Sequence, residues 1–322
     1  MSNIYSKKCS QILSLIALLL ATVAASHQIQ ADESDSASQE GGGWQLSVAA
    51  GYGQRSNPLI DSENLLILGA IQVSWFGNRW FYDDGDLGYT IEDNQHFTVN
   101  VIAQPNTERL FFENSSSVFS MISSTTFNDS TSTTSGGSSV GDDSVGGTPN
   151  EPPSGQESNQ PSTTTEIVVN ESSTRLLPDR SVAWETGLEF LTETRWGFVQ
   201  ASWLQDISQK HNGYSANIRI GRSGFWHRWT WSTHIEARYR SRQLNNYYYG
   251  ILESEATEEL LAYRAKSGIN WITGAAFRYH LSKKLNIGFV AQYERLSDAI
   301  IDSPIIVREE IATGFMGLQY KF

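Results

Sequence analysis

The sequence predicts a closed antiparallel transmembrane β-barrel of about twelve strands, with about ten as the alternative. Apolar and polar residues alternate in many stretches, most clearly over 285–294, and a period of two is the pattern of a β-strand. The chain also ends on an alternating apolar row, Met316, Leu318, Tyr320 and Phe322, which suits a last strand that pairs on both sides and meets lipid. After the N-terminal region, no stretch approaches the roughly 20 consecutive apolar residues that a membrane helix needs.

The composition agrees with a barrel and excludes some partners. Aromatic residues make up 11% of the 322 residues, enough for aromatic girdles at the two membrane interfaces. The formal net charge of −12 disfavours nucleic acid as a partner, because nucleic acid requires a basic surface. The chain has 1 cysteine, so it forms no internal disulfide, and no motif implies a cofactor.

The N-terminal region has the pattern of a secretory signal peptide, predicted over residues 1–31. Lys7 and Lys8 precede an apolar segment over 12–25, and cleavage is expected after Ala25 or after Ala31. We therefore expect export through the Sec route to the bacterial outer membrane. Residues 32–43, which are acidic and rich in serine, are expected to form a periplasmic tether before a barrel over 44–322.

The first half of the predicted barrel shows strand patterns at 44–53, 65–76 and 97–103, with a less regular stretch between the last two. That stretch, 79–91, contains Asp83-Asp84-Gly85-Asp86. Counting it as one strand gives eleven strands in all, whereas a single-chain bacterial barrel has an even number. We expect the acidic turn to split it into two strands.

Residues 113–174 interrupt this pattern with serine, threonine and glycine and almost no large apolar side chains. Such a segment cannot bury enough surface to offset the entropy of ordering, so a long disordered loop is predicted. Strand patterns resume at 181. Short turns at 192–195, 223–227 and 282–284 then alternate with longer connections at 209–213, 241–268 and 297–308, as in outer-membrane barrels.

One side of the alternating rows is polar and predicted to face the lumen. Its charged and histidine members are Glu185, Glu189, Arg219, His234, Glu236, Arg238, Arg278 and Glu294. This polar row is compatible with three functions. The first two are a non-enzymatic barrel and a narrow selective channel. The third, less favoured, is a lipid hydrolase that uses Ser232 with His234, Glu236 or His280. Asp83, Asp84 and Asp86 lack the spacing of a calcium loop, and no metal site is predicted.

Several short motifs resemble those of the MltA-interacting protein (MipA)/OmpV family of outer-membrane proteins. The resemblance is carried by Gly88-Tyr89, Asp179-Arg180, Tyr247-Tyr248-Tyr249-Gly250, Leu261 with Tyr263, the run from Tyr293 through Arg295, Leu296 and Asp298, Asp302-Ser303-Pro304-Ile305, and the C-terminal Gly317 to Phe322. The tyrosine motif and the Leu296–Pro304 motif are expected in loops, where they pack against neighbouring loops or form a docking surface. Tyr320 and Phe322 are the expected assembly signal.

The resemblance implies an outer-membrane barrel without catalytic residues. It also implies a scaffold that links a murein hydrolase, a lytic transglycosylase, to a peptidoglycan synthase, a penicillin-binding protein. Outer-membrane lipid and lipopolysaccharide are the remaining expected partners.

Overall fold

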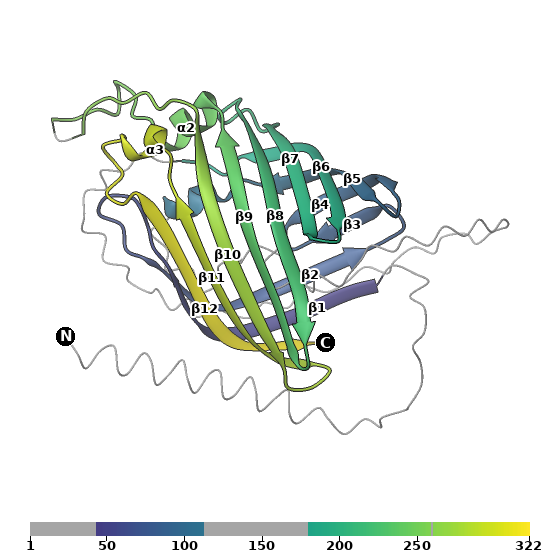
Figure 1. Ribbon diagram of the computed structural model, residues 1–322. Coiled ribbons are helices and arrows are strands. Elements are labelled where there is room, and N and C mark those ends of the chain that lie inside the picture. Colours follow the sequence, from purple (N-terminus) through teal and green to yellow (C-terminus); the bar gives the residue numbers. More distant parts are fainter. Residues whose placement is uncertain (1–42, 113–179, 259) are drawn as a thin grey trace, which may run out of the picture.

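The computed structural model describes residues 43–112, 180–258 and 260–322 (Figure 1). The predicted signal peptide, residues 32–42 of the predicted tether and the insertion at 113–174 lie outside the described residues and stay predictions, whereas Gly43 belongs to the first strand. Within the described part, no helix is long and apolar enough to cross a membrane.

Twelve strands close into one barrel, and every neighbouring pair is antiparallel, in the order β1-β12-β11-β10-β9-β8-β7-β6-β5-β4-β3-β2. This confirms the predicted fold class and twelve strands rather than ten. The strands are β1 Gly43–Arg55, β2 Leu65–Phe76, β3 Trp80–Asp83, β4 Asp86–Asp93, β5 Phe97–Pro105, β6 Trp184–Thr194, β7 Gly197–Asp206, β8 Tyr214–Trp226, β9 Trp229–Arg240, β10 Gly268–His280, β11 Leu285–Arg295 and β12 Glu310–Lys321.

The split of 79–91 into two strands is also confirmed. Asp84 and Gly85 form the two-residue turn between β3 and β4, with φ angles of 52° and 109°. Two successive positive φ angles are what a tight hairpin needs, and Asp-Gly supplies them at low cost. Because β3 has only 4 residues, it pairs with β2 only over 74–76. Among the described strands, the stretch 65–72 of β2 therefore has β1 as its one neighbour.

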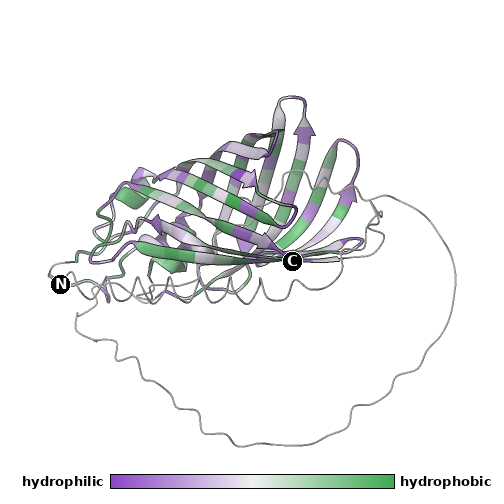
Figure 2. Cartoon of the chain, turned by 90° about the horizontal axis from the view of Figure 1, so that it is seen from below, coloured by the Kyte–Doolittle hydropathy of each residue, from purple (hydrophilic) through white to green (hydrophobic). Residues whose placement is uncertain are grey.

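Side chains alternate between lipid and lumen, as the pleat requires, and bands of opposite hydropathy follow one another along the strands in Figure 2. On β9, Ile235 is 61% exposed on the outer face, whereas its neighbour Glu236 is 1% exposed inside. On β10, Trp271 is 57% exposed and Asn270 is fully buried. The apolar rows thus form the lipid-facing surface.

The lumen is filled in layers beside β1 and β2. Near the short turns, Gln319 donates to Ser47 Oγ at 3.0 Å and to Gln72 Oε1 at 2.9 Å. Above this polar layer lies an apolar cluster of Ala49, Ile67, Ala70, Val290 and Phe315. Side chains rather than open space therefore occupy this part of the barrel.

The two rims of the barrel differ. β1 begins and β12 ends at the rim with the short turns, which we take as periplasmic because outer-membrane barrels place their short turns there. In the described residues, the longer connections at the opposite rim contain the short helices η1 Thr107–Phe111, α2 Arg242–Tyr249 and α3 Asp298–Ile301. The tyrosine motif expected in a loop is thus helical. Ser241 caps α2 by accepting a hydrogen bond from the Leu244 N–H.

Candidate functional site

A packed apolar cluster, here called the mouth cap, lies at the rim with the long connections. Figure 1 shows α2 and α3 together at this end, far from the C-terminus. The buried members of the mouth cap are Leu59, Leu65, Phe111, Phe112, Leu244, Tyr248, Tyr249, Ile251, Leu260, Leu296, Ile300, Ile305 and Ile311. They come from several connections and strand ends that are far apart in sequence. Their mutual burial holds these connections together over the lumen.

The tyrosine motif is the centre of the mouth cap. Tyr248 and Tyr249 are both fully buried. The backbone carbonyl of Tyr249 accepts a hydrogen bond of 2.6 Å from Ser303 Oγ, which joins α2 to the turn after α3. The Tyr247 hydroxyl accepts from the Ser181 N–H at 2.9 Å. The two motifs singled out in the sequence therefore pack against each other.

Arg180 stabilises the C-terminal end of α2. Its guanidinium donates to the Gly250 carbonyl at 3.0 Å and forms an ion pair with Glu255 at 2.8 Å. Hydrogen bonding from Arg180 is the main reason that the pKa of Glu255 lies below its ordinary value.

A buried group of charges, here called the mouth ion cluster, lies under the mouth cap. Arg240 is 3% exposed and contacts Glu108 closely, with Glu294 at 3.4 Å. Asn270 donates to Glu294 at 2.7 Å, and the Tyr249 hydroxyl donates to Glu108. Burial and the adjacent Glu108 raise the pKa of Tyr249 well above 10, so this hydroxyl keeps its proton. Buried charges persist only when paired in this way.

A second polar network, here called the wall ladder, crosses the inner face from β9 to β5. Glu236 pairs with Arg219 and with Arg238, each at 2.6 Å. Arg219 reaches Gln200 at 3.3 Å, and Gln200 donates to Glu189 at 2.5 Å. Asn100 completes the wall ladder by donating to Glu189 at 3.0 Å. Four of the residues assigned to the lumen thus lie in one connected network.

The other residues assigned to the lumen lie in separate places. Glu185 is buried, accepts from Asn106 at 2.8 Å, and lies 3.2 Å from Nε2 of His211. His234 packs its ring on Gly274, where any side chain would collide with it at 2.3 Å. Arg278 is 6% exposed near the other end of the barrel.

The remaining motif residues surround the mouth cap or end the chain. Arg295 pairs with Glu309 at 2.5 Å on the exposed side of β11, while its neighbour Leu296 is buried in the mouth cap. Asp298 begins α3, Asp302 ends it, and Pro304 is exposed. At the opposite rim, the rings of Tyr320 and Phe322 pack with centroids 5.0 Å apart.

The residues considered for a lipid hydrolase do not form a hydrogen-bonded triad in the described residues. Both oxygens of Glu236 are taken by arginines, and His280 contacts Thr230 and Asn286, each at 2.7 Å. Within the ranges 43–112, 180–258 and 260–322, no group of three or more His, Cys, Asp or Glu is arranged to hold a metal ion.

Sequence reasoning missed Glu108 and Asn270, although both complete the mouth ion cluster. Glu108 follows Pro105, where the strand pattern ends, and nothing nearby marks it as buried. The one available signal was Asn106, whose side chain accepts from the Glu108 N–H at 2.9 Å and starts the turn into η1.

The geometry defines a class, an outer-membrane β-barrel whose longer connections pack into a buried apolar cluster at one rim. Residues 46–322 match the model of the family described as MltA-interacting protein MipA. The chain belongs to this family, and it is an outer-membrane protein.

Individual relatives match over shorter stretches. Putative outer membrane protein YiaT of Escherichia coli (strain K12) is 28% identical over 137 residues, which is 42% of this chain and 56% of that protein. The MltA-interacting protein of Escherichia coli (strain K12) is 25% identical over 153 residues, 46% of this chain and 60% of that protein. OmpV of Vibrio cholerae is 34% identical over 68 residues, 21% of this chain and 26% of that protein. The matches thus span about six tenths or less of each relative.

Solved barrels show a more distant likeness. An outer membrane channel from Pseudomonas putida F1 has a TM-score of 0.34 at 8% identity, over 91% of this chain and 100% of that one. OmpT of Vibrio cholerae, in its in-vitro folded form, has a TM-score of 0.34 at 5% identity, over 88% and 100% of the two chains. Scores this low support no inference about function.

Proposed function

We propose that this chain is a non-enzymatic outer-membrane scaffold that docks a murein hydrolase of the lytic transglycosylase class, and with it a penicillin-binding protein, at its periplasmic rim. The observation that carries the proposal is the mouth cap. A barrel whose longer connections pack into a buried apolar cluster at one rim is poorly suited to free diffusion of solutes, so we assign its function to its surfaces. The name of one relative, MltA-interacting protein, supports a docking role.

The rim with the short turns is the surface that a periplasmic enzyme reaches. The experiment places a photo-crosslinking amino acid at Ser282, an exposed residue of the β10–β11 turn, in the full-length protein in cells. We expect capture of murein enzymes from this position. The matched control is the same probe at Val307, which is 58% exposed at the opposite rim and is expected to capture none.

The proposal is wrong if the Ser282 probe captures only lipopolysaccharide and other barrel proteins, or if both probes capture the same murein enzymes. The second result would indicate contact during export rather than docking at one rim.

A narrow selective channel is the second candidate, and two observations favour it. The wall ladder lines the lumen with charge, and the stretch 65–72 of β2 lacks a strand neighbour on the β3 side among the described strands. Planar-bilayer recording separates the candidates. We expect a silent wild-type barrel and stepwise currents from a Tyr249→Ala variant, which removes a side chain from the mouth cap. Stepwise currents from the wild type would favour the channel instead.

A further inference from the structure

The short turns carry positive charge only. The five turns at 77–79, 94–96, 195–196, 227–228 and 281–284 contain no aspartate or glutamate. Their lysines and arginines are Arg79, Arg195, Arg228, Lys283 and Lys284. The chain as a whole has a net charge of −12, so these turn residues are opposite in sign to the protein that bears them, while Asp93 and Glu193 lie at strand ends beside two of the turns. We call these five residues the basic rim.

Within the described residues, the basic rim has no carboxylate partner. Several arginines of the lumen and of the loops are paired, for example Arg219 with Glu236 and Arg180 with Glu255. No ion pair of this kind involves any of the five rim residues in the described part of the chain. Cations without a carboxylate partner are available to an external anion.

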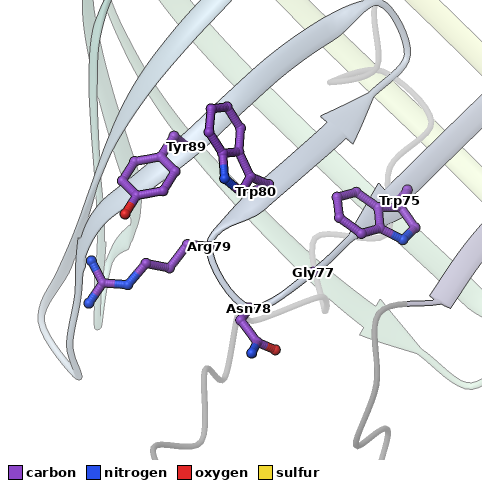
Figure 3. A pocket seen from close by; sticks show the side chains of 6 residues that line it. All are labelled: Trp75, Gly77, Asn78, Arg79, Trp80 and Tyr89. Carbon is purple, nitrogen blue, oxygen red and sulfur yellow. The ribbon is translucent and has the colours of Figure 1, made fainter. Parts of the chain in front are cut away.

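One rim cation stands in a pocket. The pocket lies at the β2–β3 turn and is lined by Trp75, Gly77, Asn78, Arg79, Trp80 and Tyr89 (Figure 3). The backbone of the turn is fixed, since the Gly77 N–H donates to the Trp80 carbonyl at 2.9 Å and the Thr90 N–H donates to the Arg79 carbonyl at 2.7 Å. Arg79 is therefore held on a rigid hairpin rather than on a mobile loop.

The side chains of this pocket form an aromatic wall beside a guanidinium. The rings of Trp80 and Tyr89 meet edge to face with centroids 4.9 Å apart, and Trp80 is 55% exposed. The Trp75 ring lies over Gly77, where an added Cβ would approach it to 2.7 Å. One terminal nitrogen of Arg79 donates to the Ile91 carbonyl at 3.3 Å, and Arg79 is an exposed residue.

We propose that this pocket binds the phosphate of an anionic phospholipid in the periplasmic leaflet. Trp75, Trp80 and Tyr89 lie on the outer, lipid-facing row of their strands at the level of the turns, where aromatic rings sit among headgroups. The guanidinium of Arg79 offers N–H donors to a phosphate, whereas the Asn78 side chain points away from it in Figure 3, so Arg79 carries the contact. The other four members of the basic rim attract the same anionic surface at longer range.

The experiment uses the full mature chain, refolded in detergent and examined by native mass spectrometry with phosphatidylglycerol and with phosphatidylcholine of the same chain length. We expect about fivefold more retained phosphatidylglycerol, which is the effect of one cation near an anionic surface. In Arg79→Gln this preference disappears. The matched control, Arg195→Gln, loses a rim cation of equal charge outside the pocket and keeps the preference.

Three outcomes overturn the proposal. An equal loss of the phosphatidylglycerol preference in Arg79→Gln and Arg195→Gln means that the lipid is attracted by the charge of the whole rim and not by a specific site. Displacement of the lipid by millimolar inorganic phosphate means a site for free phosphate. Binding of purified murein that is lost in Arg79→Gln, with lipid retention unchanged, means a glycan site. Heat-modifiable migration of each variant confirms that it has folded, and the result does not depend on whether murein enzymes dock at the same rim.

Discussion

Breaking the mouth ion cluster should destabilise the barrel far more than breaking an exposed ion pair. The substitution is Arg240→Met, which keeps much of the side-chain volume and removes the charge. Arg240 is 3% exposed, so its loss leaves the carboxylates of Glu108 and Glu294 buried without their cation. Removing one partner of a buried ion pair costs about 3–5 kcal/mol in unfolding free energy.

The matched control lies on the same strand as Glu294. Arg295 pairs with Glu309 at 2.5 Å, but the two side chains are 46% and 56% exposed. Solvent screens such a pair, so Arg295→Gln should cost no more than about 1 kcal/mol. The free energy of unfolding is measured by urea titration of tryptophan fluorescence in lipid vesicles.

A double variant, Arg240→Met with Glu294→Gln, tests the assignment to this pair. It should lose less stability than the sum of the two single variants, because Glu294→Gln removes one of the two carboxylates that Arg240→Met leaves unpaired. Equal effects of Arg240→Met and Arg295→Gln would refute the reasoning, since they would mean that solvent reaches the mouth ion cluster.

Three further predictions test other parts of the molecule. Removing Lys321 and Phe322 should slow assembly, measured as a smaller amount of heat-modifiable barrel on gels. The reason is that their backbone N–H groups donate to the Lys284 carbonyl at 2.8 Å and to the Leu46 carbonyl at 3.0 Å. The control variant Lys321→Ala keeps both N–H groups and should assemble normally. Deleting 113–174 should leave the barrel folded by the same assay, since β5 and β6 pair directly from Phe97↔Thr192 to Pro105↔Trp184, and loss of folding would contradict a loop. The ion pair of Glu255 with Arg180 should stabilise the end of α2 in full at pH values above 4.5, the ordinary glutamate pKa, and this stabilisation should be lost as pH falls through the lower pKa of Glu255 in the folded protein. Hydrogen exchange of residues 250–258 should therefore increase at that pH in the wild type. It should not increase in Arg180→Gln, where the ion pair is already absent.

The strands and their faces could be predicted because the signal is local. Alternation over β9 and β11 follows from the pleat of a single strand, and the Asp84-Gly85 turn follows from the two residues that form it. The inward placement of Glu236 and Glu294 comes from the same period of two. Such features need only neighbours along the chain.

The helix α2 was not predicted, because its residues Arg242–Tyr249 are too few to show a clear helical period. It is stabilised by burial of Tyr248 and Tyr249 against residues from other connections, which no local pattern records.

The sequence by itself determined the barrel, the lipid-facing rows and the aromatic end of the chain, since each follows from the spacing of apolar residues at every second position along a strand. Only the tertiary structure decided that the longer connections pack into the mouth cap. The contacts beneath the mouth cap join Arg240 to Glu108 across 132 residues and Tyr249 to Glu108 across 141 residues. Such pairings depend on how the closed barrel brings distant connections to one rim, and strand periodicity carries no information about which of them meet.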